Sequence, residues 1–191
     1  MYFIYEVEEW VGVSPSVAFT SDNLDKAVLD ILRRDLENKV DEEMGFIIAV
    51  IEAKVVGDGL ILPLSGDPDI YFPVRYKVLT FRPIEHEVAK GIVTKAERSG
   101  LYVRLGPRLV EGLVHRSQVM DENVVETPDG QGFQGVNTNR VVRVGDVVRV
   151  RITSIAKTGT RPAYVLKIGL TMRQPYLGKE EWLKAAAKAE T

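Results

Sequence analysis

Two arginines, Arg149 and Arg151, stand two residues apart in a run of alternating polar and apolar residues. Because successive side chains of a β-strand point to opposite faces, both arginines project from one face of such a strand. The residues between and beside them, Val148, Val150 and Ile152, then project from the other face. The alternation predicts a strand that contacts phosphates through one face, against the alternative of a merely solvated strand surface.

Four more basic residues lie upstream of this strand and can also contact phosphates: Lys95, Arg98, Arg104 and Arg116. All of these residues fall in a basic segment, 82–173, which holds 15 Lys or Arg against 9 Asp or Glu, a net charge of +6. Residues 1–81 hold 7 against 15, a net charge of −8, so the total of −2 conceals an acidic half and a basic half. We expect the basic half to bind a polyanion, the alternative being an uneven charge distribution on one compact body.

The residues needed for most catalytic or metal chemistry are scarce. The chain has no cysteine and two histidines, His86 and His115, which leaves little for a triad or a multi-histidine metal site. It lacks the Gly-x-x-x-x-Gly-Lys-Ser/Thr loop that binds nucleotide phosphates. The acidic run 41–43 has the residue types of a metal site, although an acidic turn is the commoner explanation. We therefore expect no catalytic residue, no metal and no cofactor.

The overall composition is that of a soluble globular protein. The chain has 191 residues, of which 45% are hydrophobic and 27% charged, so wholesale disorder is not expected. No run approaches the roughly 20 apolar residues that cross a bilayer, and the N-terminal residues lack the basic region of a signal peptide. With no cysteine to form a disulfide, the sequence fits a reducing interior. We expect a cytoplasmic protein that does not contact a membrane.

The first half reads as a strand over residues 1–13, a helix, and then further strands. The helix is predicted by an apolar stripe at helical spacing, with Ser21 or Asp22 as its cap. The stripe consists of Leu24, Ala27, Val28, Ile31, Leu32 and Leu36. A strand over 45–56, a tight turn at 57–59 and a return strand over 60–64 follow the helix.

The last strand of the first half is predicted over residues 71–81, where apolar and polar residues alternate. Pro73 has no N–H to donate, so this strand should lie at a sheet edge or carry a bulge. Together these elements predict an α+β domain over residues 1–81, with one main helix on an antiparallel sheet.

The second half, residues 82–191, reads as all-β. Its strands are predicted over 87–96, 101–105, 109–114, 146–155 and 163–172, which is the five-strand count of an OB-fold barrel. A polar, glycine-containing insertion occupies about 120–140, and a segment of that length is usually functional or mobile. A final helix is expected over 179–189, with Trp182 as its apolar anchor on the barrel or on a partner.

Motifs along nearly the whole chain, in order, resemble one family. They include Gly45-Phe46-Ile47-Ile48, Gly57-Asp58-Gly59, Phe81-Arg82-Pro83, Gly112-Leu113-Val114-His115-Arg116-Ser117-Gln118 and Gly145-Asp146-Val147-Val148-Arg149. The second half is similar to an S1-type OB-fold, an RNA-binding domain. The chain from residue 1 to about 175 resembles the archaeal E′ subunit of DNA-directed RNA polymerase and its eukaryotic counterpart, the seventh-largest subunit of polymerase II. A truncated RNP-like fold for residues 1–81 follows from this resemblance.

The resemblance implies a non-catalytic stalk subunit that pairs with a smaller helical subunit. It also implies that the first domain docks on the polymerase core near the clamp, and that residues 1–81 and the groove between the domains expose apolar surface that needs a second subunit. The barrel would contact nascent single-stranded RNA and assist promoter opening and processivity. Tyr102 fills the place of a family aromatic that can stack on a base, and His115 stands where many such barrels place a histidine near RNA. Ser99 replaces an aromatic that is frequent in the family, so we expect weak, sequence-tolerant contact.

Each of these assignments has an alternative. Tyr102 can be half-buried in the barrel wall, and His115 can form a structural hydrogen bond to a loop. The barrel motifs alone also fit a free-standing OB-fold RNA-binding factor of translation or RNA decay, which would act as a monomer without a dedicated partner.

Overall fold

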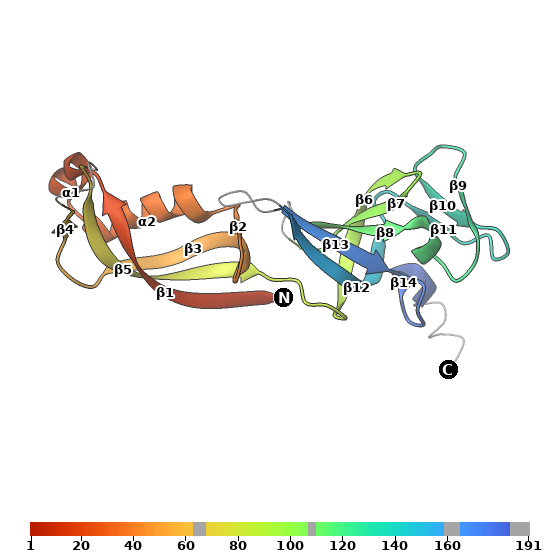
Figure 1. Ribbon diagram of the computed structural model, residues 1–191. Helices are drawn as coiled ribbons and strands as arrows, with labels where there is room; N and C mark the ends of the chain where they lie inside the picture. Colours follow the sequence, from red (N-terminus) through yellow and green to blue (C-terminus); the bar gives the residue numbers. More distant parts are fainter. Residues whose placement is uncertain (63–67, 107–109, 159–164, 184–191) are drawn as a thin grey trace. The chain divides into compact units, whose positions relative to one another are not determined.

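The computed structural model describes residues 1–62, 68–106, 110–158 and 165–183. The chain forms two compact units, Met1–Arg82 and Pro83–Thr191 (Figure 1). Within the described residues no helix combines the length and the apolar character that crossing a membrane requires. The first unit is α+β and the second is an OB-type barrel, which confirms the fold class expected from the sequence.

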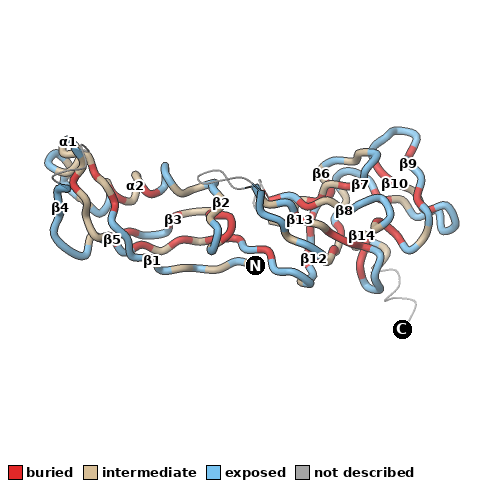
Figure 2. The backbone as a smooth tube through the Cα atoms, viewed as in Figure 1, coloured by how far each residue is buried: buried red, intermediate tan, exposed pale blue. Residues whose placement is uncertain are grey.

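The first unit is an antiparallel sheet with one long helix against it. Its strands are β1 (Tyr2–Val13), β2 (Val40–Asp41), β3 (Gly45–Val55), β4 (Leu60–Ile61) and β5 (Ile70–Phe81), in the order β1-β5-β3-β2, with β4 also pairing with β5. Helix α2 (Leu24–Leu36) places Val28 and Leu32 in the core against β1, β3 and β5. The buried positions of this unit follow β3 and β5 (Figure 2).

The N-cap of helix α2 is neither of the two predicted residues, Ser21 and Asp22, but the residue that follows them. Asn23 is the N-cap, and its side-chain oxygen accepts a hydrogen bond from the backbone N–H of Lys26 at 3.2 Å. Ser21 instead ends a short helix, α1 (Pro15–Thr20), which the sequence reading missed. Pro15 comes directly after the predicted strand and its neighbour Ser14, and proline is favoured in the first turn of a helix because its missing N–H has no intrahelical partner there.

The prediction that Pro73 marks an edge strand or a bulge is wrong. Strand β5 is central, between β1 and β3, and the register shifts of the β3–β5 ladder lie elsewhere, at 47–49 and 50–52. The carbonyl of Pro73 accepts from the N–H of Val56 at 2.9 Å, just beyond the last β3–β5 pair, Val55 with Val74. The side of Pro73 that lacks an N–H therefore faces the point where β3 ends and the β3–β5 ladder stops.

The turn at 57–59 does not fold β4 back onto β3. Strand β4 pairs with β5, through Leu60 with Tyr71 and Ile61 with Ile70, and so continues in the direction of β3. A Cβ on Gly59 would lie 2.7 Å from the side chains of Ile70 and Phe72, which explains the glycine. Residues 63 and 64 of the predicted strand lie outside the described residues.

The acidic run 41–43 forms the turn between β2 and β3. The Asp41 carboxylate accepts hydrogen bonds from the backbone N–H of Glu43 at 2.8 Å and of Met44 at 2.9 Å. Across the described parts of the chain, no three His, Asp or Glu side chains are grouped closely enough to hold a metal ion.

The second unit is a barrel of β6 (Val88–Glu97), β7 (Gly100–Arg104), β8 (Glu111–His115), β12 (Val147–Thr158) and β13 (Val165–Thr171). Its order is β13-β8-β7-β6-β12, and pairing of β12 with β13 closes the barrel. A short strand, β14 (Gly178–Lys179), adds to β12. Leu101, Val114, Val150 and other inward residues of these strands are fully buried, which is the alternation that the sequence predicts.

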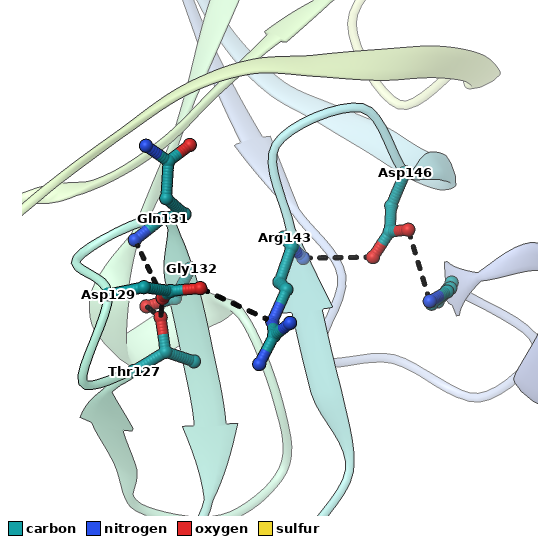
Figure 3. Close-up of polar contacts among 7 residues, drawn as sticks. Thr127, Asp129, Gln131, Gly132, Arg143 and Asp146 are labelled. Carbon is teal, nitrogen blue, oxygen red and sulfur yellow. Dashed lines mark hydrogen bonds and ion pairs between the residues drawn. The ribbon is translucent and has the colours of Figure 1, made fainter.

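The insertion at about 120–140 folds into a small sheet. The sequence alone did not decide whether this segment is structured. The sheet comprises β9 (Val124–Glu126), β10 (Gly132–Gly135) and β11 (Val141–Arg143), with Phe133 and Val142 buried. Asp129 fixes its turn by accepting from the hydroxyl of Thr127 and the N–H of Gln131 (Figure 3). The Asp129 side chain also lies 3.9 Å from the guanidinium of Arg143 in β11.

The C-terminal segment differs from the predicted helix over 179–189. Lys179 belongs to β14, and its ammonium lies 3.0 Å from Asp146 and 3.1 Å from Glu181. Helical backbone begins at Glu180 and continues to residue 183, and the remainder lies outside the described residues. Trp182 packs on the barrel unit, with its ring against the backbone of Gly178.

Candidate nucleic-acid interface

Strand pairing brings most of the predicted RNA-contacting residues onto one face of the barrel. Tyr102 of β7 pairs with Lys95 of β6 on one side and with Leu113 of β8 on the other. Arg104 follows two residues later on the same face, because Leu101 and Val103, on either side of Tyr102, are fully buried. We call the outward side of β6, β7 and β8 the Tyr102 face.

An aromatic ring and an ammonium group lie together at the centre of the Tyr102 face. The Nζ of Lys95 is 5.9 Å from the centroid of the half-buried Tyr102 ring. Lys95 also forms an ion pair with Glu97, which raises the pKa of the Lys95 ammonium. The arrangement offers a base a ring to stack on and a phosphate a cation beside it.

The two turns at one end of the Tyr102 face meet through the backbone. The N–H of Arg116, the first residue of a 3₁₀ turn over Arg116–Gln118, donates to the carbonyl of Ser99 at 2.9 Å. This places Arg98, which precedes Ser99, and Arg116 at the same end. Both side chains are exposed.

His115 has a structural hydrogen bond and an exposed ring at once. Its Nδ1 accepts from the backbone N–H of Ser117 at 3.3 Å and lies 2.8 Å from the hydroxyl of the same residue. In the neutral ring this acceptor role leaves the proton on Nε2. The predicted alternative, a structural hydrogen bond to a loop, therefore describes Nδ1. The His115 side chain as a whole is exposed, and the residue pairs in register with Gly100.

Arg149 and Arg151 lie apart from the Tyr102 face. Their strand, β12, alternates as predicted, with Val148, Val150 and Ile152 fully buried. Arg149 pairs with Lys90 and Gly178, whereas Arg151 pairs with Val88 and Thr171. Lys90 precedes Lys95 by five residues of β6, so this site is about 15 Å along the strand from Tyr102.

The β12 arginines are also less accessible than Lys95, Arg98 and Arg116, which are exposed, whereas Arg104 is half-buried as they are. Both side chains are half-buried, and the Nε of Arg151 is buried without a hydrogen-bond partner among the described residues. Charge and alternation identified these arginines, but strand order separates them from the other six predicted residues.

The first unit exposes a separate apolar surface, as the sequence led us to expect for residues 1–81. Val13, near the start of α1, pairs with Ile70, which in turn pairs with Ile61 of β4, so α1 and β4 lie at the same end of the sheet. The apolar residues exposed at this end are Phe19 (82%), Leu60 (49%), Ile61 (63%) and Leu62 (41%). We call these four residues the apolar end; the sequence analysis did not single them out.

Family models match both units. Residues 9–66 match the SHS2 domain found in the N terminus of Rpb7p/Rpc25p/MJ0397, and residues 82–167 match the S1 RNA binding domain. The two matches fall in different compact units and together cover most of the chain.

Known relatives are similar over almost the entire length. The chain is 34% identical over 188 residues to DNA-directed RNA polymerase subunit Rpo7 of Saccharolobus shibatae, covering 98% of this chain and 100% of that protein. It is 34% identical to Rpo7 of Sulfolobus acidocaldarius, covering 96% and 95%. It is 26% identical to DNA-directed RNA polymerase II subunit 7 of Arabidopsis thaliana, covering 93% and 96%. The chain belongs to the Rpo7 and RPB7 family of RNA polymerase subunits.

Proposed function

We propose that this chain is a non-catalytic, cytoplasmic stalk subunit of DNA-directed RNA polymerase. It pairs with a smaller helical subunit, docks on the polymerase core near the clamp through its first unit, and contacts nascent RNA through its barrel. In this role it assists promoter opening and processivity. The observation that carries the proposal is 34% identity to Rpo7 subunits across both units of the chain.

The Tyr102 face supports the RNA-binding part of the proposal. It combines an aromatic ring with cations of β6, of β7 and of the turn that follows β8, in a domain that matches the S1 RNA binding model. Stacking on such a ring contributes roughly 1–3 kcal/mol per base and tolerates different sequences. Contact with a transcript whose sequence changes as it is made needs that tolerance.

The apolar end supports the docking part. Phe19 is 82% exposed in a short helix that buries none of its residues in the first unit. Clustered large apolar side chains at one end of a domain are typical of surfaces that bind another protein. The apolar end lies in the unit that matches the Rpb7p-type SHS2 domain, and we assign it to the polymerase core.

A free-standing RNA-binding factor is the less supported alternative. The S1 match alone fits such a protein, because S1 domains occur outside polymerases. The similarity to polymerase subunits, however, includes the first unit as fully as the barrel. A factor working alone has no use for the exposed side chains of the apolar end.

Separate variants of the two units test the proposal. We expect Phe19→Ser with Ile61→Ser to reduce recovery of large polymerase subunits with the tagged full-length chain, and to leave RNA binding by the purified chain unchanged. Tyr102→Ala should reduce RNA binding and leave recovery of the polymerase subunits unchanged, and so serves as the matched control. Recovery of ribosomal proteins or nucleases in place of polymerase subunits by the unaltered chain would overturn the proposal.

A further inference from the structure

A groove runs between the 120–140 insertion and the C-terminal segment of the barrel unit. Its larger part has a volume of about 620 Å³ and is lined by Arg140, Tyr176 and Trp182 among others. A second hollow of about 480 Å³ begins at Arg116. The two hollows share the lining residues Met120, Asp121, Glu122, Asn137 and Arg173, so they form one continuous depression.

The groove begins where the Tyr102 face ends. Arg116 lines it and is bonded through its N–H to the carbonyl of Ser99, in the turn between β6 and β7. Gln118 then joins this end of the face to the C-terminal wall, because its carbonyl accepts from the N–H of Met172 at 2.9 Å. A strand of RNA on the Tyr102 face therefore meets the groove without crossing another element.

Two aromatic residues of the groove are placed for stacking. Tyr176 is 75% exposed and has a positive φ of 64°, a backbone conformation that non-glycine residues adopt infrequently. Trp182 is half-buried, and the guanidinium of Arg140 lies 5.9 Å from its ring centroid. Exposed aromatic rings and arginine planes both stack on nucleic-acid bases.

The carboxylates of the groove are engaged by the protein itself. Asp121 accepts a hydrogen bond from Nε of Arg173 at 3.0 Å. Glu122 accepts from the N–H of Asn137 at 2.6 Å and of Thr138 at 3.2 Å, and from the Thr138 hydroxyl, which lowers the pKa of Glu122. The charge of Asp121 is therefore offset by Arg173. Glu122 stays ionised, and its oxygens are held by the turn at Asn137 and Thr138 and face the charge of Arg140.

The cations of the groove are more available. Among the described residues, Arg116 and Arg140 have no carboxylate within ion-pair distance, although the charge of Arg140 is near enough to help lower the pKa of Glu122. The groove thus offers phosphates two guanidinium groups next to aromatic rings, which is the combination that binds single strands.

We propose that this groove is a second binding surface for single-stranded RNA, which receives the nucleotides that extend beyond the Tyr102 face. The inference rests on the proposed function, since it requires RNA on that face. It predicts that the barrel holds a longer stretch of transcript than the β6–β7–β8 strands can cover.

Binding of two RNA lengths to the full-length chain with its partner subunit tests the groove. An OB-fold covers about 4–16 nucleotides, so oligouridylates of about 5 and about 16 nucleotides bracket the face alone and the face with the groove. We expect Tyr176→Ala with Arg140→Ala to weaken binding of the longer RNA about tenfold and to leave the shorter RNA unchanged. Arg143→Ala, on the same insertion but outside the groove lining, is the control and should change neither.

The outcomes separate failure of the groove from failure of the proposed function. Equal effects on both lengths, or no effect on either, while Tyr102→Ala still weakens both, would overturn the groove and leave the face intact. If the groove variant and the Tyr102 variant both bind RNA as the unaltered chain does, the RNA-binding part of the proposed function is removed instead. Retained RNA binding with weakened polymerase association would assign the groove to a protein, again overturning our inference.

Discussion

The Tyr102 face and the β12 arginine pair have the same kinds of charge in different surroundings. On the Tyr102 face the Lys95 ammonium lies 5.9 Å from an aromatic ring, with the exposed side chains of Arg98 and Arg116 at one end. On β12 the arginines are half-buried, and Arg151 has a buried Nε without a partner in the described chain. The comparison teaches that charge on the correct side of a strand is not sufficient; neighbouring strands decide whether that charge is accessible.

Strand order explains the difference. Strand β7 lies between β6 and β8, two strands that contribute a cation and a histidine to the same outward surface. Strand β12 pairs with β6 along one edge and with β13 and β14 along the other. Its arginines therefore have the C-terminal segment as a neighbour. We expect single-stranded RNA to distinguish the two regions accordingly.

The largest effect should come from removing the geometry that joins β7 to β8. A Cβ at Gly100 would lie 2.0 Å from the carbonyl oxygen of Val114 and 2.9 Å from Cα of His115. Gly100→Ala should therefore destabilise the barrel by about 2–4 kcal/mol, measured as the free energy of unfolding in urea. Gly130→Ala in the insertion is the control: nothing lies within 4 Å of the added atom, so this variant carries only the smaller strain of its positive φ of 66°. A smaller loss at Gly100 than at Gly130 would contradict the pairing described here.

Removing the ring of the Tyr102 face should have the next largest effect. Tyr102→Ala should weaken RNA binding by about 1–3 kcal/mol, because a base loses its stacking partner. Fluorescence anisotropy with a labelled single strand measures the change. Tyr102→Phe keeps the ring and should bind nearly as the unaltered chain does. If Phe is as damaging as Ala, the hydroxyl rather than the stacking surface is responsible.

The comparison between the two basic regions becomes sharpest in the salt dependence. For single strands, each phosphate contact contributes about 0.7 to the slope of log affinity against log salt concentration. Arg104→Ala with Arg116→Ala should lower that slope by about 1.4, if each arginine contacts one phosphate. Arg149→Ala with Arg151→Ala removes the same charge and should change the slope less. An equal change in both double variants would show that RNA extends over β12 as well.

Periodicity predicted most of the fold. Hydrophobic periodicity shows which side of a helix or strand is buried. The alternation in β5 and β12 and the apolar stripe of α2 therefore predicted these three elements. The insertion was harder, because short strands such as β9 and β11 have too few residues to show a period. Pro73 misled for another reason: its missing N–H matters on one side of the strand, and the sequence does not show where β3 ends.

The candidate site was predictable in part. Tyr102, Lys95 and Arg104 were identified by residue type, motif and strand pattern, and the pairing of β6 with β7 then brings them together. The apolar end was missed because Phe19, Leu60 and Ile61 come from distant segments whose only link is the pairing of β1, β4 and β5. Arg140 and Tyr176 of the groove were missed likewise, since neither lies in a recognisable motif.

The smallest effect concerns Glu97, the carboxylate paired with Lys95. Glu97→Gln should increase RNA affinity about twofold, because an exposed ion pair is weak and its loss frees the ammonium for a phosphate. The same change should let the pKa of Lys95 fall towards its ordinary value, since the pair with Glu97 raises it. In the unaltered chain the ion pair is complete below the ordinary pKa of lysine and is lost as the pH rises through the raised value.

Titration of the Lys95 ammonium by NMR, with anisotropy on the same variant, checks both effects together. Glu111→Gln removes a carboxylate paired in register with Arg104 on the same face, whose charge also raises the pKa of Lys95 but less than Glu97 does, so it should lower that pKa less than Glu97→Gln. A fall in RNA affinity for Glu97→Gln would mean that Glu97 positions Lys95 over the Tyr102 ring rather than competing for it. The Tyr102 face would then depend on a fixed ion pair. Its difference from the β12 arginines would lie in how firmly Lys95 is held in place more than in how exposed its cations are.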